Sequence, residues 1–159
     1  MRRIFRWSML VFAIGWCLFI WHFSLADGAA SSTTSGGVMN AVNGLLSDMG
    51  IDESISHTAI RKAGHFLEFF ALGFLAAWGF LLHDFHHFLP YSVATAFVVG
   101  GVDEILQIFT PGRNPSFIDV SLDTVGGACG ALFFCLAALI YCAIRDRLRK
   151  KSEINQKSS

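Results

Sequence analysis

Long apolar runs separated by short polar segments dominate the pattern of this chain. Four runs reach the roughly 20 residues that a helix needs to cross about 30 Å of hydrocarbon. They cover residues 4–26, 63–82, 91–109 and 117–144. No alternation of period two runs through them, and only helices and closed barrels satisfy backbone hydrogen bonds in lipid. The pattern therefore predicts an all-α, polytopic membrane protein with four transmembrane helices.

Basic residues gather at the two ends of the chain. MRRIFR precedes the first run and RDRLRKK follows the last. Lys and Arg are retained on the cytoplasmic side of a membrane, so both termini are predicted to be cytoplasmic, which an even number of spans allows. The connections at 26–62 and 110–116 then face outward, and the connection at 83–90 faces inward.

Composition agrees with a membrane protein, because 53% of the residues are hydrophobic and only 15% are charged. The formal net charge is zero, and we expect no nucleic acid partner. All four Cys fall inside the apolar runs without CxxC spacing, which favours packing roles. The first run has a second interpretation, a secretory signal that ends at Ser24-Leu25-Ala26. Its length and its Trp and Phe content favour an uncleaved anchor.

Polar segments divide the chain into four regions: an anchor helix (1–26), an extracytoplasmic linker with a short amphipathic helix (27–60), a three-helix region (61–145) and a basic cytoplasmic tail (146–159). Residues 27–37 include SSTTSGG, which is typical of a flexible, solvated connector. Apolar residues spaced by three and four from Val38 to Met49 predict the short helix. It lies either in the lipid interface or over the helix bundle.

Small residues recur in the last three runs. Lipid gives helices no hydrophobic reason to associate, so small side chains that let two backbones approach mark the contact faces. The positions predicted to make these contacts are Gly73 and Ala77, Gly100 and Gly101, and Gly126 and Gly130.

Ionisable side chains interrupt the same three runs. A charge buried in lipid costs roughly 2.5 kcal/mol or more, so such residues mark candidate functional sites. At about 1.5 Å per residue from the outer ends, Glu68, Glu104 and Asp123 share a depth of roughly 9 Å. A shallower layer, at roughly 3 to 5 Å by the same count, comprises His65, Gln107 and Asp119. We expect both layers to surround an outward-facing polar cavity.

The charges of this candidate cavity do not balance. Three basic residues stand against five acidic ones: Arg61, Lys62 and Arg113 against Glu68, Asp103, Glu104, Asp119 and Asp123. Either some carboxyls are protonated, or a divalent cation or a cationic ligand lies among them. His65 is a candidate ligand or proton carrier. The alternative is that these residues only hold the helices together. Arg113, in the turn PGR, contacts an anion or pairs with a neighbouring acid.

Three motifs occur in order: RKAGHFLEFFALGFL, DEILQIFTPGR and SFIDVSLDTVGG. In residues and spacing, the region from about 60 to 130 resembles the VanZ-like family of bacterial membrane proteins. The resemblance implies a multi-pass protein of the bacterial cytoplasmic (inner or plasma) membrane. The signature positions that it implies are Arg61, Lys62, His65, Glu68, Asp103, Glu104, Gln107, Arg113, Asp119 and Asp123. Two positions depart from the family pattern, which usually has an aromatic hydroxyl where this chain has Phe69 and an Asn where it has Asp123.

The founding member of this family is associated with resistance to the glycopeptide antibiotic teicoplanin, without an established molecular activity. The resemblance therefore implies a phenotype rather than a reaction. Our first hypothesis is a protein that binds an envelope lipid, another small ligand or a cation and alters access of glycopeptides to the cell envelope. A second is a membrane-embedded enzyme on a lipid-linked envelope precursor, with His65 or Glu68 as base and Arg113 as anion contact. A third is a proton- or cation-coupled transporter, which would need a homodimer.

Overall fold

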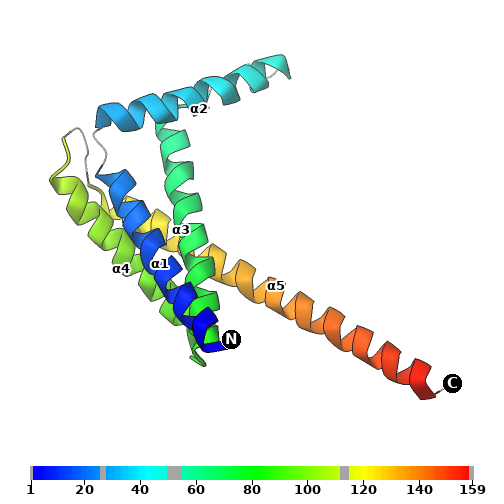
Figure 1. The fold of residues 1–159 in the computed structure, drawn as a ribbon. Coiled ribbons are helices and arrows are strands. Elements are labelled where there is room, and N and C mark those ends of the chain that lie inside the picture. Colours follow the sequence, from blue (N-terminus) through cyan, green and yellow to red (C-terminus); the bar gives the residue numbers. More distant parts are fainter. Residues whose placement is uncertain (1, 26–27, 50–54, 112–114, 158–159) are drawn as a thin grey trace.

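The computed structural model describes residues 2–25, 28–49, 55–111 and 115–157, and these residues form five α-helices and no strand (Figure 1). The helices are α1 (Arg2–Ser24), α2 (Gly28–Asp48), α3 (His57–Leu82), α4 (Phe88–Ile108) and α5 (Phe117–Lys157). Of these, α1, α3, α4 and α5 are long and apolar enough to cross a membrane. The predicted all-α polytopic membrane protein with four spans is thus confirmed. The cytoplasmic placement of both termini stays a prediction.

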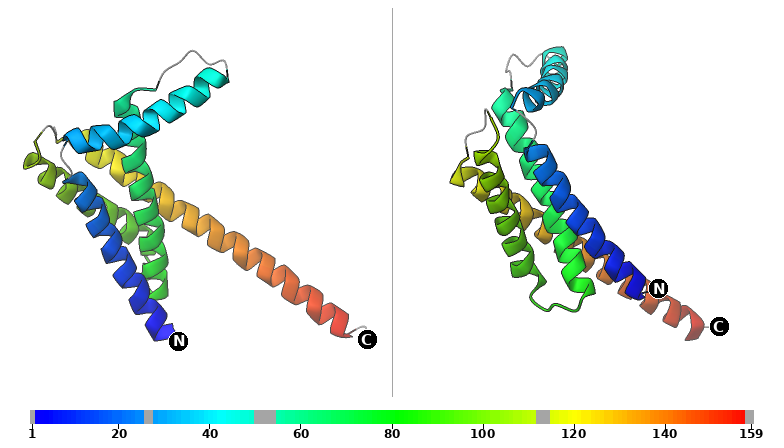
Figure 2. Two further views of the ribbon diagram at one scale, coloured as in Figure 1. Left: turned by 45° about the horizontal axis from the view of Figure 1, so that its top comes forward. Right: turned by 60° about the vertical axis from the view of Figure 1, so that its left-hand side comes forward.

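Three of the spans, α1, α3 and α4, run side by side, and α2 lies across one end of them (Figures 1 and 2). α5 makes its most extensive contact with α3, and its C-terminal part leaves the bundle at an angle. At the end opposite α2, a guanidinium nitrogen of Arg6 donates to Asp84 Oδ2 at 2.8 Å. The start of α1 therefore lies beside the connection between α3 and α4.

α2 is longer than the helix predicted from Val38 to Met49. It begins at Gly28, so the flexible connector expected over 27–37 is helical from its second residue. Gly and Ser are poor helix formers, but each residue added to an existing helix gains a backbone hydrogen bond, and no Pro interrupts this segment. Near the other end of α2, the backbone N–H of Ile55 donates to Asn43 Oδ1 at 2.8 Å, which ties α2 to the start of α3.

Glycines form the contact between α3 and α5. A Cβ added to Gly73 would overlap the backbone of Gly127, one on Gly130 would overlap the carbonyl oxygen of Phe70, and one on Gly126 would lie 2.7 Å from the carbonyl oxygen of Phe66. The prediction of close backbone contacts holds for Gly73, Gly126 and Gly130. Gly127, which the sequence did not single out, also lies against Ala96 of α4.

Gly101 is a correction, because an added Cβ there would meet no atom within 4 Å. Its neighbour Gly100 faces the bundle, where an added Cβ would lie 3.3 Å from Asp123 Cβ. Adjacent residues on a helix point about 100° apart, since a turn holds about 3.6 residues, so the two glycines cannot share one face. Of the two, Gly100 is the one in the packed interface.

α1 is joined to the bundle by packing and by two indole hydrogen bonds. Ile20 is 1% exposed and belongs to a core cluster with Phe69 of α3. The indole N–H of Trp16 donates to the carbonyl oxygen of Glu68 at 3.0 Å, and that of Trp21 donates to the carbonyl oxygen of Val99 at 3.3 Å. In a bilayer, polar atoms satisfied between helices hold the helices together. α1 is therefore an integral part of the packed structure.

Candidate functional site

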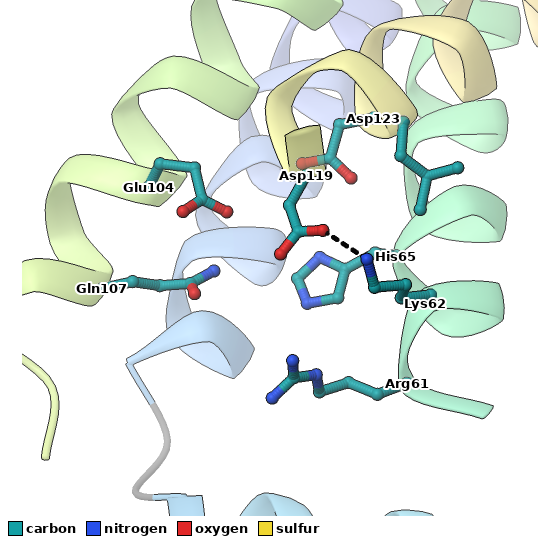
Figure 3. Close-up of a pocket in the computed structure, with 8 residues that line it drawn as sticks. Arg61, Lys62, His65, Glu104, Gln107, Asp119 and Asp123 are labelled. Atoms are coloured by element: carbon teal, nitrogen blue, oxygen red, sulfur yellow. Dashed lines mark hydrogen bonds and ion pairs between the residues drawn. The ribbon is translucent and has the colours of Figure 1, made fainter. Parts of the chain in front are cut away.

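A polar pocket lies where α3 begins, α4 ends and α5 begins, at the end of the bundle opposite the Arg6–Asp84 ion pair (Figure 3). Eight of the residues that the structure describes line it, and only one of these is apolar. The lining consists of Arg61, Lys62, His65, Glu104, Gln107, Asp119, Asp123 and the apolar Leu122. In Figure 3, side chains of α4 approach from one side and those of α3 from the other, with the two aspartates of α5 between them.

The pocket is narrow. It contains about 280 Å³ of space, including the part open at its mouth, but only about 10 Å³ of this can hold the centre of a water-sized molecule. A volume of about 10–15 Å³ on that measure is what one water molecule requires. The interior therefore has room for one water or a bare ion, and a larger ligand has to stay at the mouth.

Two contacts join the start of α5 to its neighbours. Lys62 Nζ donates to Asp119 Oδ1 at 2.9 Å, and the side chains of this ion pair are 41% and 24% exposed. The backbone N–H of Ser116 donates to Glu104 Oε2 at 2.7 Å, immediately before α5 begins. A carboxylate at a helix N-terminus is stabilised by the unpaired N–H groups and the helix dipole there. Glu104 thereby fixes the first turn of α5 against α4.

A buried hydrogen-bond network connects α1 to α4. Asp103 Oδ2 accepts from Ser24 Oγ at 2.9 Å and from Gln107 Nε2 at 2.8 Å. Gln107 Nε2 also donates to Ser24 Oγ at 3.0 Å. All three side chains are buried. Ser24 was not among the predicted site residues, because in the sequence it stands out only as part of the small-residue cleavage pattern Ser24-Leu25-Ala26.

Asp123 is the most unusual side chain of the pocket. It is 1% exposed, and within the described part of the chain neither of its carboxyl oxygens has a hydrogen-bond partner. Potential metal-ligating atoms of His65, Asp103 and Asp123 all lie within 4.8 Å of one another. These three residues come from α3, α4 and α5. Among the described residues, this is the group whose side chains could together hold a metal cation.

The structure brings together most of the predicted site residues. Seven of the ten line the pocket, and Asp103 adjoins it through its short distance to His65 and Asp123. Glu68 is not among the described residues that line the pocket, although it lies on the same helix as His65. Arg113 lies outside the described residues. The predicted shallower and deeper layers adjoin each other, since ligand atoms of His65 and Asp123 lie within 4.8 Å.

A bundle of membrane-spanning helices that encloses charged side chains at one end defines a class of polytopic membrane proteins with an intramembrane polar site. Within that class, a family model described as VanZ/LLP1 matches residues 9–140, most of the chain. The chain belongs to the VanZ-like family. The match includes α1 from its third turn, all of α2 to α4 and the first half of α5. No curated protein and no solved structure matches the chain.

Proposed function

We propose that this chain is a binding protein of the bacterial cytoplasmic membrane whose pocket faces outward and takes a cationic group of an envelope component. Binding there changes the access of lipidated glycopeptides such as teicoplanin to the envelope, and so contributes to resistance. Membership of the VanZ-like family supports the link to the phenotype, and the pocket supports the link to a ligand.

The observation that carries the proposal is the surplus of acid in the pocket. Its lining holds two bases, Arg61 and Lys62, against Glu104, Asp119 and Asp123, and Asp103 adjoins them. The Lys62–Asp119 ion pair uses one base and one acid. Acids buried among apolar helices attract positive charge, because an uncompensated charge in that environment is costly. A small cation or an ammonium group is the ligand that this surplus favours.

The size of the pocket favours binding over chemistry. A lipid-linked precursor could not bring a scissile bond beside His65 while only about 10 Å³ is open to a water-sized centre. An enzyme or a transporter would require the helices to separate, and the glycine contacts between α3 and α5 oppose separation. The part of the ligand that enters is therefore small, and the rest stays at the mouth.

The test is antibiotic susceptibility in a sensitive Gram-positive host that expresses the intact chain or a Glu104→Gln variant at matched membrane levels. This substitution removes the charge but keeps the contact with Ser116, since an amide oxygen still accepts that hydrogen bond. We expect the intact chain to raise the inhibitory concentration of teicoplanin several-fold, more than that of vancomycin, and the variant to lose this protection.

The matched control is Asp84→Asn, which also neutralises one carboxylate but lies at the opposite end of the bundle. It should protect as well as the intact chain. Equal protection by Glu104→Gln would reject the role of the acidic pocket, and no protection by the intact chain would reject the resistance function.

A further inference from the structure

We infer that His65, Asp103 and Asp123 form a binding site for a divalent transition-metal cation of the Zn²⁺ or Mn²⁺ type at the inner end of the pocket. This inference deepens the proposed function, on which it rests only in sharing the same pocket. It names an ion for the interior of the pocket, where only about 10 Å³ can hold the centre of a water-sized molecule.

The geometry is close to that of a metal site. The ligand atoms of the three residues lie within 4.8 Å of one another. Metal–ligand bonds of about 2.0–2.2 Å place two ligands of one ion at most about 4.4 Å apart. Side-chain rotation alone can make up the difference. One imidazole with two carboxylates suits Zn²⁺ and Mn²⁺, and the interior space of about 10 Å³ has room for the bare ion.

The burial of Asp123 is the independent observation that points to a ligand. Its side chain is 1% exposed, and among the described residues neither oxygen accepts or donates a hydrogen bond. A polar group buried without a partner is costly, and a charged one costs more. The absence of a side chain at Gly100 makes room for this aspartate, since a Cβ there would lie 3.3 Å from Asp123 Cβ. A bound cation would satisfy both oxygens.

Hydrogen bonds hold the Asp103 carboxylate in place, as they usually do for a carboxylate that ligates a metal. Its Oδ2 accepts hydrogen bonds from Ser24 and Gln107 at 2.9 and 2.8 Å. Outer partners of this kind fix the orientation of a ligating carboxylate and are a regular part of metal sites. α1 thus contributes to the site through Ser24 although it supplies no ligand.

Charge balance also favours a divalent ion. As metal ligands, the two carboxylates would be deprotonated and the imidazole neutral, so one M²⁺ ion would balance their two negative charges. Lys62, a base of the same pocket, is engaged by Asp119 at 2.9 Å. Breaking or omitting the partner of a buried charge is strongly destabilising, so neutralisation within the cluster matters for the fold as well as for binding.

The test uses the full chain purified in detergent without a polyhistidine tag, stripped with a chelator and titrated separately with Zn²⁺ and with Mn²⁺. We expect one equivalent of at least one of these ions to bind. Asp123→Asn should weaken binding at least about tenfold, because even changes in outer partners of a metal site cost about 10–100-fold.

Asp84→Asn is again the matched control, and it should bind as tightly as the intact chain. Asp84 has a φ of 63°, a left-handed conformation that Asn adopts readily, so the control variant keeps its local backbone. A second measurement uses bound Mn²⁺ and electron paramagnetic resonance: a hyperfine coupling to an imidazole nitrogen should be present in the intact chain and lost in His65→Gln.

No stoichiometric binding of either ion, or equal binding by Asp123→Asn, would overturn the inference. If Asp123→Asn fails to elute as a folded species, His65→Gln decides: binding of the same ion as tightly as by the intact chain, or survival of the nitrogen coupling in this variant, overturns the inference. Glycopeptide protection without metal binding would reject this site and retain the proposed function. Metal binding without glycopeptide protection would retain this site and reject the proposed function.

Discussion

Ser24 shows how one small side chain joins two helices through a buried carboxylate. It is 2% exposed, donates to Asp103 and accepts from Gln107. A buried carboxylate that loses a donor bears part of its desolvation cost again, and the amide of Gln107 would lose an acceptor as well. Ser24 therefore stabilises both the docking of α1 and the acidic cluster.

We predict that Ser24→Ala lowers the free energy of unfolding by about 1–3 kcal/mol, the cost of leaving buried polar groups unsatisfied. The measurement is a titration of SDS into the protein in mild detergent. Ser121→Ala is the control, because Ser121 is exposed and donates to its own helix, to the carbonyl oxygen of Phe117 at 3.0 Å. Its effect should stay within about 0.5 kcal/mol. Equal effects of the two variants would contradict a role for the network.

At this scale, the sequence predicts which polar residues meet but not their partners. The positions of His65, Gln107 and Asp119 near the outer ends of three apolar runs were sufficient to predict that they meet, and all three line one pocket. Glu68 was expected in the same cavity, yet it is not among the described residues that line the pocket, because the spacing of residues along one helix does not fix which side chains reach the opening. Ser24 is uncharged and small, so nothing in its sequence context distinguishes it from a packing residue.

At the scale of elements, the contact between α3 and α5 depends on glycine. Because the backbones meet directly, there is no side chain that could move aside to accept an added methyl group. Alanine normally stabilises a helix interior relative to glycine by about 0.5–1 kcal/mol. The sign of that effect should invert where the added Cβ meets another backbone.

We predict that Gly130→Ala destabilises the protein by about 1–3 kcal/mol, as overpacking does, since its Cβ would overlap the carbonyl oxygen of Phe70. Gly101→Ala should be neutral or stabilising, because nothing lies within 4 Å of its Cβ position. Both values come from the same detergent titration. A Gly130→Ala protein as stable as Gly101→Ala would mean that α3 and α5 are packed less closely than described.

The four spans were predictable because each apolar run is long enough to leave no other stable backbone arrangement in lipid. The ends of the helices were less predictable. α3 starts at His57, six residues before the apolar run, because the Ser56 side chain accepts a hydrogen bond from the N–H of Ala59 and caps the helix. The helical course of α2 through residues 28–37 was not predictable, because Ser, Thr and Gly have weak preferences there and the outcome depends on the rest of α2.

For the whole molecule, the start of α1 and the connection between α3 and α4 lie at one end, and α2 lies at the other. The basic residues at both ends of the sequence predict that the end with Arg6 is cytoplasmic. The polar pocket would then open to the outside, as the proposed function requires.

We predict that Met49→Cys, in a chain whose native cysteines are replaced by Ala, reacts with a membrane-impermeant maleimide on intact cells. Met49 is 74% exposed just after α2. Ser152→Cys, in the exposed C-terminal part of α5, should react only after the membrane is permeabilised. The chain without cysteines gives the background. The reverse labelling pattern would place the pocket on the cytoplasmic side and remove it from contact with external antibiotics.

The length of α5 has a consequence for the pocket. Its apolar run, 117–144, has 28 residues, about 42 Å at about 1.5 Å per residue, whereas hydrocarbon is about 30 Å thick. A helix that exceeds the bilayer in this way can tilt, and packing against its neighbouring helices sets that tilt. Asp119 and Asp123 lie in its first two turns. The direct backbone contact of Gly126 and Gly130 with α3 therefore sets the inclination of α5, and it keeps these carboxylates beside His65 in bilayers of different thickness.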